Sequence, residues 1–423
     1  MAQSIGAAIF FSYIITYDNN KMSKNIVMIG AGVANVNAAT KLIDNNFDGK
    51  ITIMDMGKNP YERKYSEVME GFLGAGGWSD GKLTYHTSIG GQLSKYTGDE
   101  KAMELMDQVI SNFKRFHPKP EAVQCSNPIA EPDFIKPYFG LKLFPVWHVG
   151  TDYLHEIGKN WYDFLINNDV EFLWETKVTD INFDESIIRA DSENSQTIRL
   201  YDKLIFGVGK SGIDFGKKLA EKYELPTEPK SVQIGVRFEA PQKHFQKLID
   251  VSYDFKLYRK YEDKGVSLRS FCTNNNAAYV AVEETYGDHS YNGHARKDEA
   301  FRDGAGLYYS PSRKPSTTSE NVDVSAVQIT SEELFIVRKQ FEGYFTYIDD
   351  FINDMKKVFP TLKNDWGIYI PEVKYLSPEP LVNYNNLSLN KYENVHFVGD
   401  ALSARGITVS GAHGIYVAEN INI

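Results

Sequence analysis

Residues 25–55 contain the feature that most constrains the fold of this 423-residue chain. An apolar run, Asn25–Ile29, enters the glycine turn Gly30-Ala31-Gly32; an amphipathic helical pattern follows, and Lys50–Met54 then forms a second strand that ends at Asp55. A glycine turn between a strand and a helix lets the backbone approach a pyrophosphate at the positive end of the helix. Asp55 follows at close to the ~20-residue spacing of an acid that hydrogen-bonds a ribose hydroxyl. This order of elements predicts a Rossmann-type dinucleotide site.

The predicted turn departs from the usual GxGxxG sequence at its third glycine, which is Asn35 here. That glycine normally allows the helix to pack closely on the strand, so Asn35 predicts a slightly opened turn. The alternative is an ordinary turn from a buried strand into a helix. Asp55 favours a free ribose hydroxyl over a 2′-phosphate, and therefore FAD or NAD over NADP.

A glycine-rich segment downstream of Arg63 favours FAD over NAD. Residues 70–84 read EGFLGAGGWSDGKLT, a stretch of backbone with little side-chain bulk. Such a chain can lie flat against a planar ring and offer N–H groups to it. An ordinary glycine-rich hairpin is the alternative.

Later strands are expected to return beneath the pyrophosphate. Asp202–Phe206 leads into Gly207-Val208-Gly209, and Asn394–Val398 leads into Gly399-Asp400 and then a final helix near Ile407. An aspartate in this place suits ribityl or ribose hydroxyls, and a helix N-terminus suits the pyrimidine edge of a flavin. An NAD-only dehydrogenase needs no such C-terminal return. Two further runs, 171–176 and 177–181, are expected to be strands paired with each other.

The candidate cofactor-binding residues all lie in these turns and strand ends. They are Gly30, Gly32, Val33, Ala34, Asp55, Arg63, Gly77, Ser79, Asp80, Gly81, Val178, Gly207, Gly209, Gly399, Asp400, Gly406 and Ile407. No metal site is expected, because the histidines do not fall at ligand spacing with carboxylates.

Composition limits the partners of the chain. A formal net charge of −10 argues against a dominant electrostatic attraction to nucleic acid. Two cysteines, Cys125 and Cys272, allow neither a disulfide framework nor a four-cysteine metal site, so a reducing, cytoplasmic compartment is expected. The apolar run Ile5–Ile15 is too short to span a bilayer. We expect residues 1–21 to be an extension outside the fold and no membrane partner, with a membrane-associating segment as the alternative.

The length favours two domains. We expect an α/β fold in which a Rossmann-type FAD-binding domain is assembled from discontinuous segments around an inserted α+β substrate domain. Within the insertion, Val232–Glu239 alternates as a strand with one covered face, and Leu334–Val358 has helical periodicity. The expected segments are an N-terminal extension at 1–21, FAD-binding parts at 22–98, 150–225 and 377–423, and substrate-domain parts at 99–149 and 226–376.

Several short motifs give the chain a family resemblance. They are GGWSDGKLT at 76–84, HVGTDYL at 148–154, GVRFE at 235–239, Asn292-Gly293, Gly399-Asp400 and Arg405-Gly406. With the dinucleotide turn, they resemble the poorly characterised bacterial FAD-dependent dehydrogenases within the two-domain flavoproteins of the glutathione-reductase type. The match is patchy but spans most of the chain from Met22, and it departs at Asn35 and around Cys272. The resemblance implies FAD and redox chemistry but no agreed substrate.

These features predict an FAD-dependent oxidoreductase that transfers hydride between flavin N5 and an unidentified small or medium organic substrate. Lys82, Arg269, Arg405 and His413 are candidates for catalysis or substrate binding, and Arg237 is a further candidate to hold an anionic substrate. One alternative is a flavin-dependent modification enzyme or lyase that acts on an amine or amino-acid adduct of a nucleobase. Another is a non-catalytic binding protein on the same fold. No stable binding of nucleic acid is expected, and the sequence leaves the oligomeric state open.

Overall fold

A five-stranded parallel sheet contains the predicted strand–turn–helix unit. In the computed structural model this sheet has the order β23-β11-β1-β2-β7, and every adjacent pair is parallel. Its strands are β1 (Lys24–Ile29), β2 (Gly49–Met54), β7 (Glu171–Leu173), β11 (Lys203–Phe206) and β23 (Val395–Phe397). The Rossmann-type α/β fold expected from the sequence is confirmed, including the return of the C-terminal strand beside β11.

The structure describes residues 24–422, apart from 65–66, 194, 229–231, 263–265, 278, 286–287, 295–306, 310–320, 332–333 and 376–377. The expected extension at 1–21 therefore lies outside the described residues. Within the described part of the chain, no helix combines the length and the apolar character needed to cross a membrane.

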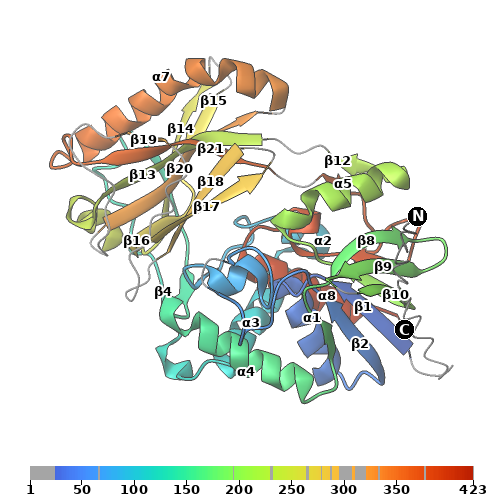
Figure 1. The fold of residues 1–423 in the computed structure, drawn as a ribbon. Helices are drawn as coiled ribbons and strands as arrows, with labels where there is room; N and C mark the ends of the chain where they lie inside the picture. The colour runs from blue at the N-terminus through green and yellow to red at the C-terminus, as the bar shows by residue number, and fades with distance from the viewer. Residues whose placement is uncertain are drawn as a thin grey trace, which may run out of the picture.

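Helices α1 (Val33–Asp44) and α8 (Ile407–Asn420) pack against each other beside the parallel sheet. The contact is close because it is made through small residues: a Cβ added to Gly414 would lie 1.9 Å from the carbonyl oxygen of Ala34. The C-terminal helix thereby begins near the start of α1, although the two are far apart in sequence (Figure 1).

Helix α3 (Asp99–Arg115) is placed differently from the sequence prediction, which assigned 99–149 to the substrate domain. Its buried stripe of Leu105, Val109 and Phe113 belongs to the core of the Rossmann lobe, and the helix packs on α8. In the same segment, β5 (Gly140–Leu143) pairs with β14 (Phe255–Tyr261) of the other lobe. The segment 99–149 thus contributes to both lobes. Its helix α3 joins the Rossmann lobe because α8 covers the apolar face of α3, and its strand β5 joins the other lobe by pairing with β14.

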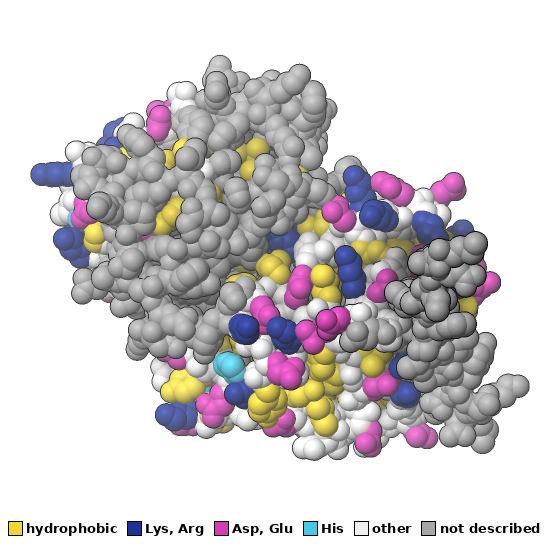
Figure 2. All heavy atoms as spheres, viewed as in Figure 1, with side chains coloured by type: hydrophobic (Ala, Val, Ile, Leu, Met, Phe, Trp, Pro, Cys, Tyr) yellow, Lys and Arg dark blue, Asp and Glu magenta, His cyan; other side chains and the backbone are white. Residues whose placement is uncertain are grey.

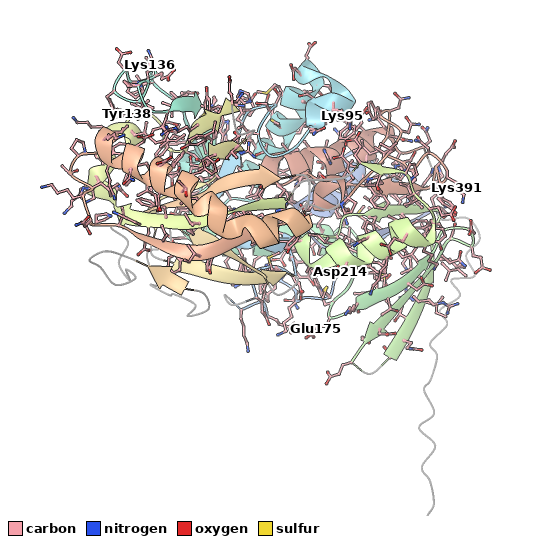
Figure 3. All side chains as sticks on the ribbon, turned by 90° about the horizontal axis from the view of Figure 1, so that it is seen from above. Lys95, Lys136, Tyr138, Glu175, Asp214 and Lys391 are labelled. Atoms are coloured by element: carbon pink, nitrogen blue, oxygen red, sulfur yellow. The ribbon has the colours of Figure 1, made fainter. Side chains whose placement is uncertain are left out.

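The second lobe is an eight-stranded antiparallel sheet covered by one long helix. The expected strand at 232–239 is β13 (Val232–Pro241), and the expected helix is α7 (Leu334–Val358). Phe238 on β13 and Phe351 on α7 lie in one buried cluster. Figures 1 and 3 show α7 lying along this sheet; in Figure 3, Lys136 and Tyr138 lie at this end of the molecule and Lys391 at the Rossmann end.

The remaining strands of this sheet are β15 (Val266–Arg269), β16 (Thr273–Ala277), β19 (Leu307–Tyr309), β20 (Asn321–Ser331) and β21 (Gly367–Lys374). A separate pair, β17 (Tyr279–Thr285) and β18 (Asp288–His294), packs on it.

Among the smaller sheets of the described residues, two have three strands. The first joins β8 (Lys177–Asn182), β9 (Ile187–Ser192) and β10 (Ser195–Leu200). The predicted pairing of 171–176 with 177–181 is therefore wrong: β7 completes the parallel sheet, whereas β8 pairs with β9. The second joins β3 (Lys82–Thr84), β6 (Val146–His148) and β4 (Gln124–Ser126).

Candidate functional site

The turn after β1 requires glycine at its first position for reasons internal to the protein. Gly30 has φ +91°, in the left-handed region that favours glycine, and a Cβ there would lie 2.7 Å from the carbonyl oxygen of Gly207. The turns that follow β1 and β11 therefore lie against each other backbone to backbone at this point.

Asn35 compensates for the missing third glycine. Its side chain is fully buried, and Nδ2 donates to the carbonyl oxygens of Ile29 (2.9 Å) and Gly30 (2.7 Å). The expected opening of the turn is not needed, because the amide satisfies the two carbonyl groups at the end of the strand. A Cβ on Gly207 would meet this amide at 2.7 Å, so Gly207 is a glycine because Asn35 fills the space beside it.

Gly32 and Gly209 are different, because nothing in the protein demands glycine at either position. Their φ values, −71° and −77°, suit any residue. Among the described residues, a Cβ on Gly32 would meet only the carbonyl oxygen of Gly207, at 3.9 Å, and one on Gly209 would meet nothing within 4 Å. Two glycines that border open space on neighbouring strand-end turns form a cradle that side chains would fill.

The starts of α1 and α8 converge on the glycine-rich segment. A Cβ on Gly76 would lie 2.5 Å from Cγ2 of Val33 and 3.5 Å from Cγ1 of Ile407. Neither helix has a side-chain cap at its N-terminal glycine, Gly32 or Gly406, and neither has an acid in its first turn. Both positive helix ends are thus available to an anionic or polar ligand.

Asp55 and Arg63 organise the loops around this cradle. The Asp55 carboxylate accepts hydrogen bonds from the backbone N–H groups of Ala31 (2.7 Å), Gly57 (2.7 Å) and Gly71 (2.8 Å). Since a carboxylate accepts about four hydrogen bonds, one position remains for the expected ribose hydroxyl.

Arg63 is buried and donates to four backbone carbonyl groups of residues 67–74. Burial lowers its pKa to about 10, and its guanidinium lies 4.4 Å from the centre of a Trp78 ring. We assign it to the shape of the loop rather than to direct cofactor contact.

Asp400 supplies an unsatisfied acceptor at the end of β23. Its Oδ1 accepts from Nε of Arg405 at 2.9 Å, whereas its buried Oδ2 has no hydrogen-bond partner among the described residues. Gly399 beside it has φ +65°, and its Cβ would lie 3.3 Å from Cβ of Ala34. A buried carboxylate oxygen without a donor is costly, and a ligand hydroxyl would satisfy it.

The remaining nominated residues have internal explanations. Ser79 donates to the carbonyl oxygen of Gly76, Gly81 has φ +73° against Val149, and Val178 is buried in the Rossmann core. A Cβ on Gly77 would lie 2.7 Å from Cβ of Leu73. These residues shape the glycine-rich segment and its support.

Lys82 lies in a buried ion network at the junction of the two lobes. Its Nζ contacts Oδ2 of Asp80 (2.8 Å), Oδ2 of Asp254 (3.2 Å) and the carbonyl oxygen of Thr273 (2.6 Å). The two carboxylates outweigh burial and raise the pKa of Lys82, so its ammonium group stays charged with all three protons engaged. This geometry favours a role as an anchor between the lobes over the reacting role suggested by the sequence.

The other three candidates are not gathered around one point. His413 is fully buried on α8, 5.7 Å from the Tyr96 ring between centroids, and burial lowers its pKa to about 4. The partly exposed Arg405 pairs with Asp400 and also donates to the carbonyl oxygen of Tyr375. Arg269 is exposed at the end of β15 and stacks on Phe271. Among these three, Arg405 is the residue joined to Asp400 at the end of β23.

Asp254, the second carboxylate of the Lys82 network, was missed by the sequence reasoning. Lys82 and Asp254 are 172 residues apart, and no local motif connects them. In the sequence, Asp254 is an aspartate two residues before Lys256 at the start of a strand. Nothing in this local pattern indicates that its partner is Lys82.

No protein-family model matches the chain, and no curated protein matches it either. Solved structures do resemble it. A flavoprotein/dehydrogenase from Cytophaga hutchinsonii is 13% identical, over 94% of this chain and 77% of that one, with a TM-score of 0.43. Glycine oxidase from Geobacillus kaustophilus is 8% identical, over 94% and 95%, with a TM-score of 0.45. Glycerol-3-phosphate dehydrogenase from Bacillus halodurans, complexed with FAD, is 11% identical, over 93% and 63%, with a TM-score of 0.40. All three are distant likenesses.

Proposed function

We propose that this chain is an FAD-dependent oxidoreductase that transfers hydride between flavin N5 and an organic substrate. The observation that carries the proposal is the cradle: Gly32 and Gly209 border space that the protein leaves open, and Oδ2 of Asp400 is buried without a donor. A dinucleotide with a polyhydroxyl chain accounts for all three, since its pyrophosphate needs close backbone approach and its hydroxyls donate to a carboxylate.

Two features favour FAD over NAD. The C-terminal strand β23 returns beside β11 and delivers Asp400, and α8 then begins against Val33 through Ile407 and Gly76. The start of α1 would hold the pyrophosphate, Asp400 the ribityl hydroxyls, and the start of α8 the pyrimidine edge of the ring. FAD supplies the hydride chemistry when bound, and the protein supplies binding, orientation and electrostatics.

The substrate would lie against the polar face of the antiparallel sheet. β13 alternates between Val236 and Phe238, which lie in the core under α7, and the buried polar residues Arg237 and Glu239. Arg237 donates to the carbonyl oxygen of Tyr291 at 3.0 Å, which fixes its guanidinium. Such a face can orient a polar organic molecule and exclude water from the reacting atoms.

We also propose a cytoplasmic protein without stable nucleic-acid or membrane partners. The net charge of −10 and the two unpaired cysteines support this. On the described face of the Rossmann lobe in Figure 2, basic and acidic side chains are interspersed rather than segregated. The nucleobase-modification alternative would need a basic surface, and no described feature favours it.

The direct test is the absorbance spectrum of the purified protein, followed by extraction and identification of any flavin. We expect FAD, bound in preference to FMN, because FMN has no pyrophosphate for the α1 turn. The bound flavin should bleach when candidate substrates are added without oxygen. A protein that binds no FAD at micromolar concentration, or that carries only FMN, would refute the proposal.

A further inference from the structure

A histidine and a tyrosine from the two lobes form a hydrogen-bonded pair at their junction. His148 ends β6 on the Rossmann side, and Tyr253 lies just before β14 of the antiparallel sheet. Tyr253 Oη lies 3.0 Å from Nε2 of His148, with the rings edge to face at 4.9 Å between centroids. Both side chains are half-buried.

A second hydrogen bond fixes the protons of this pair. The backbone N–H of Gly150 donates to Nδ1 of His148 at 3.0 Å. A backbone N–H can only donate, so Nδ1 is the unprotonated nitrogen and Nε2 carries the proton of the neutral ring. Nε2–H therefore donates to the Tyr253 oxygen, and the tyrosine's own O–H must point to another acceptor. Among the described residues no such acceptor is present.

The surroundings keep both groups in these protonation states. Burial lowers the pKa of His148, which favours the neutral ring, and burial raises the pKa of Tyr253 to about 12, which keeps the phenol protonated. His148 is the direct strand partner of Lys82 in the β3–β6 pairing, and Asp254 follows Tyr253 in the chain. The ion network at the lobe junction thus holds the pair in place from both sides.

We infer that Tyr253, oriented by His148, donates its O–H to a carbonyl or carboxylate oxygen of the substrate. Because the Tyr253 oxygen accepts a hydrogen bond from the His148 Nε2–H, its own O–H is a stronger donor, and a carbonyl or carboxylate oxygen is the acceptor it suits. Lys82 follows the glycine-rich segment at 70–81, which is expected to lie against the flavin ring, and its Nζ pairs with Asp254, the neighbour of Tyr253. On that expectation we place the donor on the substrate side of the flavin. The placement of this donor beside the flavin rests on the proposed function. The hydrogen-bond geometry of the His148–Tyr253 pair does not depend on it.

The first experiment examines the donor itself. Protein with ¹⁵N-labelled histidine is studied by NMR, and His148→Gln assigns the signal. We expect the Nε2–H tautomer at neutral pH, and the signal should shift in Tyr253→Phe but not in Tyr258→Phe, whose tyrosine is 41% exposed on β14. An Nδ1–H tautomer, or a signal insensitive to Tyr253→Phe, would overturn the inference.

The second experiment measures ligand binding by calorimetry, with pyruvate, acetate and acetone as probes. Pyruvate carries a carboxylate and a ketone, acetate only a carboxylate, and acetone only a ketone. The three probes therefore distinguish a carboxylate acceptor from a carbonyl acceptor. We expect binding of at least one probe at millimolar concentration, weakened roughly threefold to tenfold in Tyr253→Phe and unchanged in Tyr258→Phe, as the loss of one hydrogen bond predicts. Absence of binding by all three, or equal binding by Tyr253→Phe, would overturn it.

Flavin content, measured on the same samples, separates the two proposals. If the wild-type protein holds FAD but Tyr253→Phe binds the probes as well as wild type does, the donor inference fails and the flavoprotein proposal stands. If the wild-type protein holds no FAD but shows the expected tautomer and probe binding, the flavoprotein proposal fails and the oxygen-acceptor site stands.

Discussion

Replacing Gly32 with valine should abolish cofactor binding while leaving the chain folded. Gly30→Ala, in contrast, should lower the stability of the fold itself. At Gly32 the backbone is extended, with φ −71° and ψ 171°, and the nearest protein atom to an added Cβ is 3.9 Å away. The substitution therefore meets no steric obstacle in the protein. Its cost to the free energy of unfolding is that of a poorer helix N-cap, about 0.5–1 kcal/mol.

The effect on the cofactor should be much larger. The valine side chain would fill the space beside the start of α1 that the pyrophosphate is proposed to occupy. We expect the affinity for FAD to fall at least ~100-fold, which corresponds to about 2.7 kcal/mol. Gly209→Val, on the neighbouring turn, should weaken FAD binding in the same way, because no atom of the described residues lies within 4 Å of its added Cβ.

Gly30→Ala is the matched control. Here φ is +91° and the added Cβ would lie 2.7 Å from the carbonyl oxygen of Gly207, so the left-handed conformation costs ~1–2 kcal/mol before the clash is counted. The assay is a thermal melt of the cofactor-free proteins beside a titration with FAD. The reasoning is refuted if Gly32→Val keeps stoichiometric FAD, or if it lowers the melting temperature as far as Gly30→Ala does.

Three other substitutions examine single side chains. Asp400→Ala should weaken FAD binding ~10- to 100-fold, which is equivalent to ~1–3 kcal/mol of binding free energy. It should not lower the melting temperature of the cofactor-free protein. Unchanged affinity in a titration with FAD would show that Asp400 does not face the cofactor. His413 has a pKa of about 4 in the folded chain against 6.5 ordinarily, so its contribution to stability is complete above pH 6.5 and is lost as pH falls toward 4, by about 3 kcal/mol. His413→Leu should therefore reduce the acid sensitivity of unfolding measured by denaturant titration and keep FAD, whereas loss of catalysis with FAD intact would restore a catalytic role. Lys82→Met should lower the free energy of unfolding by ~3–5 kcal/mol in the same titration, because it leaves Asp80 and Asp254 buried without their shared cation. The surface control Lys101→Met should lower it by under ~1 kcal/mol. Equal losses in the two variants would contradict the buried network.

The elements whose signal is local could be predicted from the sequence. The strand–turn–helix unit, the strand at 232–239 and the helix at 334–358 follow from periodicity and turn residues within short windows, and the structure has each of them. Gly30 could be predicted because a tight turn after a strand needs a left-handed residue. The Gly-Asp return at 399–400 was also visible, since a strand that ends in these residues is a compact pattern.

Only the tertiary structure decided how distant segments combine. Asn35 reads as a defect in a motif until its amide is seen to satisfy the carbonyl groups of the turn. The apolar face of α3 fits either lobe until α8 covers it, and the strand at 177–182 pairs with the strand that follows it, at 187–192, rather than with the run that precedes it. The Lys82–Asp254 and His148–Tyr253 pairs join residues more than a hundred positions apart. Hydrophobic periodicity specifies which face of an element is buried but not which element buries it, so these contacts, and the protonation states that follow from them, arise from packing alone.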